Sequence, residues 1–143
     1  MAERLASNEE AVAYMREVAV AQSGFSRFLE VEPIRCWRGE AELTLAMRPD
    51  LTQHHGHAHG AIVGLMADNA CAWAAASVAG DVVTGGYSIN FLNPARGQRL
   101  RAKGMVVKPG RRQVVVRADV WAETDGAEPV LAAVAQATVV PVG

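Results

Sequence analysis

His59-Gly-Ala-Ile-Val-Gly-Leu-Met-Ala-Asp-Asn-Ala-Cys-Ala-Trp-Ala-Ala-Ala-Ser-Val-Ala79 is the segment from which the fold follows. Alanine dominates it, its large side chains are apolar, and Asp68 is its single acid. A membrane span is a competing interpretation, but Asp68 and Asn69 lie at its middle, and a central Asp costs roughly 2.5 to 3.5 kcal/mol on insertion. We therefore expect a buried helix of a soluble protein over residues 59–79.

Segments of alternating polar and apolar residues lie on both sides of this helix, as in strands with one buried face. The alternation is clearest in residues 40–47 and 99–104, and residues 82–92, 113–122 and 130–140 complete a set of five or six strands. One long helix among mostly consecutive strands predicts an α+β fold, in which an antiparallel sheet of five or six strands wraps around one central helix.

The N-terminal segment carries a helix start signal. Ser7 followed by Glu10 has the form of a capping box, and apolar residues then recur at helical spacing. We expect a first helix from about Asn8 to Ala21, within an N-terminal helical extension over residues 1–25. The chain has 143 residues, 50% of them hydrophobic, so we predict a single domain over residues 1–143.

The cysteines and the N-terminal composition bear on the cellular compartment. Cys36 and Cys71 are too few for a disulfide framework, and we expect reduced thiols. Residues 1–10 contain acids and lack the apolar core of a signal peptide. We therefore expect a cytoplasmic protein.

The net charge of -1 hides a basic region, because eight of the 14 lysines and arginines lie between positions 96 and 117, with no acid among them. The solvated face of a hairpin is the favoured interpretation, and a site for a phosphate-bearing small ligand is the alternative. A nucleic-acid partner is not expected, since no aromatic or helical reading element accompanies these cations.

Asp68 and the start of the helix are the candidate chemical groups. A carboxylate in an apolar helix is either held by a hydrogen-bond donor or kept for function, and the residues leave both open. A helix start offers free backbone N–H groups, so the amides near Gly60 and Ala61 could hold a carbonyl oxygen as it gains charge. Alternatively, Gly60 only eases the loop into the helix.

Spacing limits how these groups can work together. Asp68 is eight residues past Gly60, which places the two about 12 Å apart along one helix. A single carbonyl cannot touch both, so a shared site would combine Gly60 of one chain with Asp68 of another across a twofold axis. A stripe of small residues fits such an approach, although packing against the chain's own sheet explains it equally well. Its members are Ala61, Gly64, Asp68, Ala72 and Ala75.

The motif of Gln53, His59-Gly60 and Asp68, followed by residues 87–95 and by Pro109-Gly-Arg111, resembles the PaaI-like acyl-CoA thioesterases of the hotdog superfamily. The similarity covers roughly positions 40 to 140. It implies a central helix wrapped by an antiparallel sheet, dimers that pair into tetramers, and hydrolysis of acyl-CoA. It implies no metal and no cofactor, since coenzyme A is part of the substrate.

The resemblance also implies residue roles. Asp68 corresponds to the carboxylate that acts as general base or nucleophile, and the amide of Gly60 polarises the thioester carbonyl. His59 corresponds to the histidine that orients the loop and the thioester, and Gln53 to the residue that positions the attacking water. Thr84 lies near the place where some members have a Ser or Thr that helps to orient this water.

Further substrate contacts are expected from the same resemblance. The candidates for the CoA phosphates are Arg96, Lys108, Arg111 and Arg112. Ala61 stands where many members have a second glycine, and its methyl group is expected to narrow the carbonyl pocket. The residue types, rather than the resemblance, suggest an acyl pocket lined by Leu51, Met66, Trp73 and Phe91, with enough apolar surface for an aryl or medium-chain acyl group.

Two alternatives remain open. The family pattern does not demand His54, His55 and His57, and in an extended loop His55, His57 and His59 would share one side and could bind zinc or another transition metal. A hotdog module that binds acyl-CoA without hydrolysing it is the other alternative. The complete set of Gln53, His59, Gly60 and Asp68 favours the enzyme.

Overall fold

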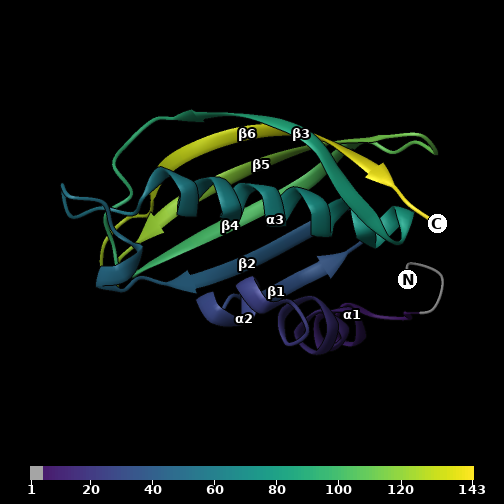
Figure 1. The fold of residues 1–143 in the computed structure, drawn as a ribbon, viewed down its shortest axis with the longest axis horizontal. Helices are drawn as coiled ribbons and strands as arrows, with labels where there is room; N and C mark the ends of the chain where they lie inside the picture. The colour runs from purple at the N-terminus through teal and green to yellow at the C-terminus, as the bar shows by residue number, and fades with distance from the viewer. Residues whose placement is uncertain (1–4) are drawn as a thin grey trace.

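A six-stranded antiparallel sheet curls around one long helix in the computed structural model, which describes residues 5–143 (Figure 1). The helix is α3 (Gly60–Ala79). The strands are β1 (Glu32–Trp37), β2 (Glu40–Ala46), β3 (Val82–Phe91), β4 (Arg99–Lys108), β5 (Val114–Glu123) and β6 (Val130–Pro141). This architecture confirms the predicted α+β fold with a central helix.

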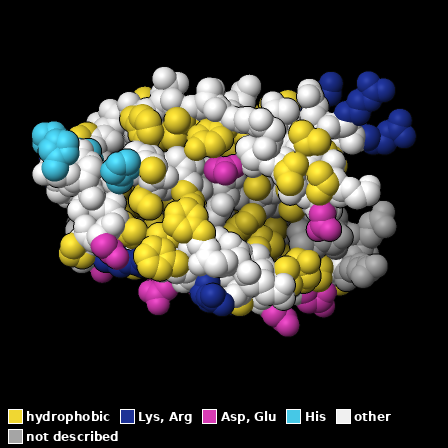
Figure 2. Space-filling view, viewed as in Figure 1, with side chains coloured by type: hydrophobic (Ala, Val, Ile, Leu, Met, Phe, Trp, Pro, Cys, Tyr) yellow, Lys and Arg dark blue, Asp and Glu magenta, His cyan; other side chains and the backbone are white. Residues whose placement is uncertain are grey.

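The strand order β1-β2-β4-β5-β6-β3 places β3 at one edge of the sheet, although it follows α3 directly in the chain. Within residues 5–143, β3 pairs only with β6. Its Val83, Tyr87 and Phe91 side chains are 52%, 44% and 56% exposed. Figure 2 shows apolar side chains over the face on which α3 and β3 lie. An exposed apolar edge of this kind is typical of an interaction surface.

The central helix packs its alanines against the sheet. Met66, Ala67, Ala70 and Ala74 are 0% exposed and face the strands, so backbone atoms of helix and sheet come close together. The helix has the length and apolarity of a membrane span, and 56% of its most apolar window is buried inside the fold. Packing against the sheet therefore accounts for the apolar sequence of α3.

The N-terminal region contains more elements than predicted. α1 (Asn8–Tyr14) begins where the capping box places it, with the Glu10 amide donating to the Ser7 hydroxyl at 3.2 Å. α1 continues directly into a π-helical segment (Met15–Val20), and together they span residues 8–20, close to the predicted helix. A separate helix α2 (Gly24–Leu29) follows, which was not predicted. The helical region thus extends past the predicted limit at residue 25. Residues 1–4 of the predicted extension lie outside the described part of the chain.

Candidate active site

The loop before α3 is a tight turn rather than an extended segment. The Gln53 amide donates to the His57 carbonyl at 2.9 Å, and the Gly56 amide donates to the Gln53 carbonyl at 2.9 Å. Gly56 has a φ of 81°, which favours glycine. A further bond from the His59 amide to the Leu51 carbonyl, at 2.9 Å, closes the base of the loop. These backbone bonds hold Gln53 beside His57.

His59 caps α3 with its own ring. The Ala61 amide donates to His59 Nδ1 at 3.0 Å. Because a backbone amide only donates, Nδ1 carries no proton and the ring is the neutral Nε2–H tautomer. The first residue of a helix has no intrahelical acceptor for its N–H, so the Gly60 amide remains free to bind a ligand. The sequence suggests the amides of both Gly60 and Ala61 as donors to a carbonyl oxygen. Only the Gly60 amide remains available, because the Ala61 amide already donates to His59.

Asp68 lies half-buried on α3 and is held by β3. Thr84 Oγ1 donates to Asp68 Oδ1 at 2.6 Å. No cation pairs with Asp68 within residues 5–143, and only Oδ1 accepts a hydrogen bond there. The carboxylate therefore has one positioned donor and one free oxygen. Burial, with a contribution from the Asp68 charge, raises the pKa of the neighbouring Cys71 thiol to about 12.

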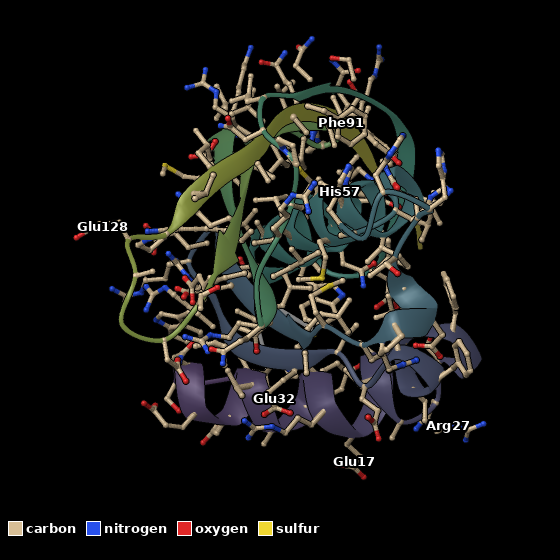
Figure 3. All side chains as sticks on the ribbon, turned by 90° about the vertical axis from the view of Figure 1, so that its left-hand side faces the viewer. Glu17, Arg27, Glu32, His57, Phe91 and Glu128 are labelled. Carbon is tan, nitrogen blue, oxygen red and sulfur yellow. The ribbon has the colours of Figure 1, made fainter. Side chains whose placement is uncertain are left out.

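A cleft of about 270 Å³ opens beside the start of α3. Gln53, His57, Gly60 and Phe91 line it, together with apolar residues that include Val63 and Leu92. Figure 3 looks onto this end of the molecule and shows His57 and Phe91 near the end of α3. A methyl group on Gly60 would lie 3.4 Å from the Phe91 ring, so Phe91 lies close to the start of α3.

One chain thus carries two separate parts of the predicted site. Gln53 and Gly60 border the cleft, with His59 beside them. Asp68 lies further along α3, bonded to Thr84 of β3, and neither of these two residues lines the cleft. Gly60 and Asp68 both lie on α3, as the sequence-based estimate of about 12 Å between them assumed.

The predicted acyl pocket is wrong for three of its four residues. Leu51, Met66 and Trp73 are 4%, 0% and 7% exposed and belong to the core. Leu51 ends a short 3-10 turn (Pro49–Leu51), whereas Met66 and Trp73 lie on α3. Phe91 alone lines the cleft. Helix periodicity gives the spacing of Met66 and Trp73, but it does not show which face of α3 the sheet covers.

The predicted phosphate contacts fall at two ends of the molecule. Lys108, Arg111 and Arg112 lie exposed at the turn between β4 and β5, where Arg111 borders a depression of about 510 Å³ with Val78 and Ala79. Arg96 lies instead beside the loop of residues 53–59, in a groove of about 450 Å³. Arg48 and His57 line the same groove, and no sequence motif pointed to a role for either residue there.

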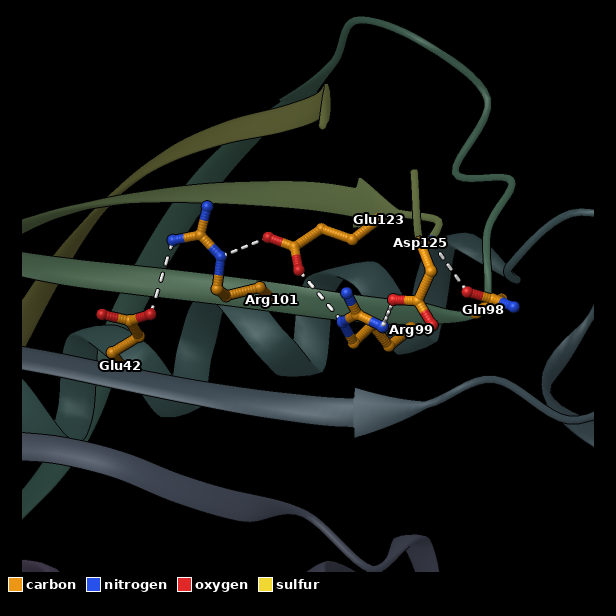
Figure 4. Close-up of polar contacts among 6 residues, drawn as sticks. All are labelled: Glu42, Gln98, Arg99, Arg101, Glu123 and Asp125. Atoms are coloured by element: carbon orange, nitrogen blue, oxygen red, sulfur yellow. Dashed lines mark hydrogen bonds and ion pairs between the residues drawn. The ribbon is translucent and has the colours of Figure 1, made fainter. Parts of the chain in front are cut away.

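Two other cations of the basic region are paired with acids (Figure 4). Arg99 bonds to Glu123 at 3.0 Å and to Asp125 at 2.9 Å, and Arg101 bonds to Glu123 and to Glu42. The acids come from β2, from β5 and from the turn after β5. The register of β2, β4 and β5 brings these arginines and acids together. The pairing supports the interpretation that these arginines lie on a solvated face of the sheet.

Glu123→Gln should lower the free energy of unfolding by about 1 kcal/mol at neutral pH. The hydrogen bond from Arg101, followed by that from Arg99, holds the pKa of Glu123 below its usual 4.5, against the opposing effect of partial burial. A carboxyl group with a lowered folded-state pKa stabilises above the unfolded value, and this contribution is lost as the pH falls below about 4.5.

Urea denaturation at neutral pH and in acid measures this effect. The Glu123→Gln variant and the parent should converge in acid, because both then lack the charge. Asp125→Asn is the matched control, since its side chain is 77% exposed and makes one ion pair. A stability difference that persists unchanged in acid would contradict the assignment.

The metal-binding alternative finds no support in the geometry. The loop is turned rather than extended. The His55 and His57 rings stack at 6.3 Å between centroids, while His59 Nδ1 accepts the Ala61 amide. Across residues 5–143, no three His, Cys, Asp or Glu side chains are grouped so that they could hold a metal ion.

Comparisons with known proteins point to one family. Residues 55–128 match the profile of the thioesterase superfamily. A thioesterase family protein from Silicibacter pomeroyi has 34% identity and a TM-score of 0.84, with 90% of this chain and 96% of that chain covered. No curated protein matches the chain.

Two proteins of phenylacetic acid degradation are also similar in structure. A mutant form of PaaI from Thermus thermophilus has 27% identity and a TM-score of 0.73, over 84% of this chain and 100% of that chain. PaaI from E. coli has 20% identity and a TM-score of 0.82, over 96% and 97% of the two chains. At 20% identity the likeness shows the shared fold.

Proposed function

The chain belongs to the thioesterase superfamily as a PaaI-like hotdog protein, and we propose that it is an enzyme that hydrolyses acyl-CoA thioesters as a homo-oligomer. The observation that carries the proposal is the division of the site. Gly60 and Gln53 border a cleft, while Asp68 with its Thr84 partner lies about 12 Å further along α3. Two antiparallel copies of α3 bring the Gly60 end of one chain to Asp68 of the other.

The exposed edge of the sheet supports this pairing. β3 has an unpaired edge within residues 5–143, and its Tyr87 and Phe91 side chains are half-exposed beside α3. A second copy of the chain that docks there covers these apolar side chains and brings the helices side by side. A homodimer, alone or paired into a tetramer, is the oligomer that we propose.

The reaction begins with the thioester carbonyl against the Gly60 amide. Thr84 donates to Asp68 Oδ1, which leaves Oδ2 as the oxygen that reacts in this proposal. In one route this oxygen takes a proton from a water held by Gln53, and the resulting hydroxide adds to the carbonyl carbon. In the other route Oδ2 attacks that carbon and forms an anhydride, which water then hydrolyses.

Both routes break the carbon–sulfur bond. The Gly60 N–H stabilises the negative charge that develops on the carbonyl oxygen, as in an oxyanion hole. Coenzyme A leaves as a thiolate and takes up a proton, and the products are the free acid and CoA. The chemistry needs no cofactor beyond the CoA of the substrate.

The lining and the volume of the cleft support our proposal that the substrate carries an aryl or medium-chain acyl group. Phe91, Leu92 and Val63 provide an apolar wall next to Gly60, while the volume of about 270 Å³ limits the bulk that fits within one chain. Arg96, Lys108, Arg111 and Arg112 are the cations that we propose for the CoA phosphates. All four are exposed and have no ion-pair partner within residues 5–143.

Release of free thiol from aryl, short, medium and long acyl-CoA substrates tests the function. Turnover should be fastest with the aryl or medium-chain compounds, and it should persist when a chelator is present. Burial raises the pKa of Cys36 to about 11 and that of Cys71 to about 12, so a thiol reagent should detect CoA and spare the folded protein. This suits the reducing cytoplasm that we propose as the setting.

The same assay has a clear negative outcome. A folded protein that binds acyl-CoA but releases no thiol from any member of the panel would be a binding module and not an enzyme. Activity that remains full at dilutions where the protein is monomeric would contradict the proposed site between two chains.

A further inference from the structure

The side-chain amide of Gln53 is oriented by a backbone group. The His55 amide donates a hydrogen bond to Gln53 Oε1. A backbone N–H only donates, so the atom that faces it must be the oxygen of the Gln53 amide. The nitrogen of that amide therefore points the other way, toward His57.

This orientation determines the state of the His57 ring. Gln53 Nε2 lies 2.9 Å from His57 Nε2. An amide NH₂ group only donates, so His57 Nε2 must carry a lone pair and the ring proton must sit on Nδ1. His57 Nδ1 faces the Ala58 carbonyl at 3.4 Å, which accepts that proton. His57 is thus the neutral Nδ1–H tautomer, the reverse of His59.

The charged groups beside His57 are two arginines, one of which, Arg48, is paired with Asp50 at 2.8 Å. Arg48 and Arg96 line the groove on one side of His57, and no carboxylate lines that groove or the cleft on the other side. The His55 ring is stacked on that of His57, at 6.3 Å between centroids. A protonated His57 would turn a donor toward the NH₂ group of Gln53 and break the bond between them.

We propose that His57 is a positioning residue, which holds the Gln53 amide in the one orientation that presents it to the cleft beside Gly60. The proposal rests on the proposed function, in which Gln53 holds the attacking water. His55 and His57 each use one hydrogen-bonding position of the amide, and one N–H and one lone pair remain for water. An amide fixed at both ends places that water more narrowly than a free side chain would.

The backbone allows the role of the side chain to be tested alone. The bonds from the Gln53 amide to the His57 carbonyl and from the Gly56 amide to the Gln53 carbonyl do not involve the imidazole. A substitution at position 57 should therefore leave the turn in place. The exposed His54, in the same loop, provides a matched control.

Kinetics with an aryl acyl-CoA provide the first test. His57→Leu removes the acceptor for the Gln53 amide and should lower kcat about five- to tenfold, with KM nearly unchanged. The loss of one neutral hydrogen bond frees the Gln53 side chain, which then holds the attacking water less precisely. His57→Gln can accept the same hydrogen bond through its oxygen and should retain most of kcat, and His54→Ala should match the parent. If His57→Leu keeps the parental kcat, the positioning role is overturned.

The tautomer provides a second test, which needs no catalysis. Nitrogen-15 NMR of the labelled protein should show the Nδ1–H form for His57 and the Nε2–H form for His59, with His57 assigned from the spectrum of His57→Gln. An Nε2–H or doubly protonated His57, under conditions of full activity, would overturn the proposal. A parent with the expected tautomer but no hydrolysis would overturn the water-positioning role together with the proposed function, while the Gln53–His57 hydrogen bond would stand.

Discussion

Asp68→Asn should lower kcat by roughly 10² to 10⁴-fold and leave the fold unchanged. The Asn side chain keeps an oxygen that can accept the 2.6 Å bond from Thr84, so the local structure has no reason to change. What it loses is the negative charge and basicity of the free oxygen, which either proposed route requires. Thiol release with saturating acyl-CoA measures kcat, and thermal unfolding checks that the melting temperature stays close to that of the parent.

Asp81→Asn is the matched control for this substitution. Asp81 is an exposed acid just beyond the end of α3, and its backbone carbonyl, not its side chain, makes the contact with Val142. It should turn over substrate at the parental rate. An Asp68→Asn protein that does the same would remove the carboxylate from the mechanism.

Mixed oligomers test whether the site spans two chains. Asp68→Asn and Gln53→Ala each disable every site in their own homodimer. In a mixed dimer, one site combines the intact Gln53 of one chain with the intact Asp68 of the other. Random reassociation should therefore restore about a quarter of the parental activity, because half the dimers are mixed and half their sites are intact. No recovery after demonstrated exchange of subunits would place both residues in one chain.

The parts of the fold that the sequence predicts are those with a regular pattern. The alanine-rich α3 and the alternating strands follow from helical and two-residue periodicity. β1 has no counterpart among the predicted segments, because Pro33 and a register shift before Arg35 break its alternation. The start of α1 follows from its capping box, whereas nothing in the sequence marks the π-helical turn that follows.

The candidate site is also predictable from the sequence only in part. The spacing of Gln53, Gly60 and Asp68 is visible in the sequence, and so is the distance that separates their roles. Thr84 reaches Asp68 from a strand whose register shifts between Thr84 and Gly86, and a sequence motif does not specify such a shift. The pairing of His57 with Gln53 depends on the turn between them. The metal-binding alternative assumed an extended loop, in which this pairing would not form.

Gly104 is the point where the sheet touches the central helix. It lies in β4, between Ala41 of β2 and Ala118 of β5. A methyl group on Gly104 would lie 2.2 Å from the carbonyl oxygen of Ala70 and 2.5 Å from its carbonyl carbon, so it would overlap backbone that no side-chain rotation can move. Because Gly104 has no side chain, the backbone of α3 can pack directly against β4.

Gly104→Ala should therefore lower the free energy of unfolding by about 3 kcal/mol, at the upper end of overpacking effects, because the helix must lift away from the sheet. Urea denaturation measures the loss, and Gly24→Ala is the control, since a methyl group on Gly24 meets nothing within 4 Å. The control should stay within about 0.5 kcal/mol of the parent. Because α3 carries both Gly60 and Asp68, lifting it should also displace the two parts of the site and lower kcat in protein that remains folded. A Gly104→Ala protein that unfolds at the parental urea midpoint would mean that helix and sheet lie further apart than these distances indicate.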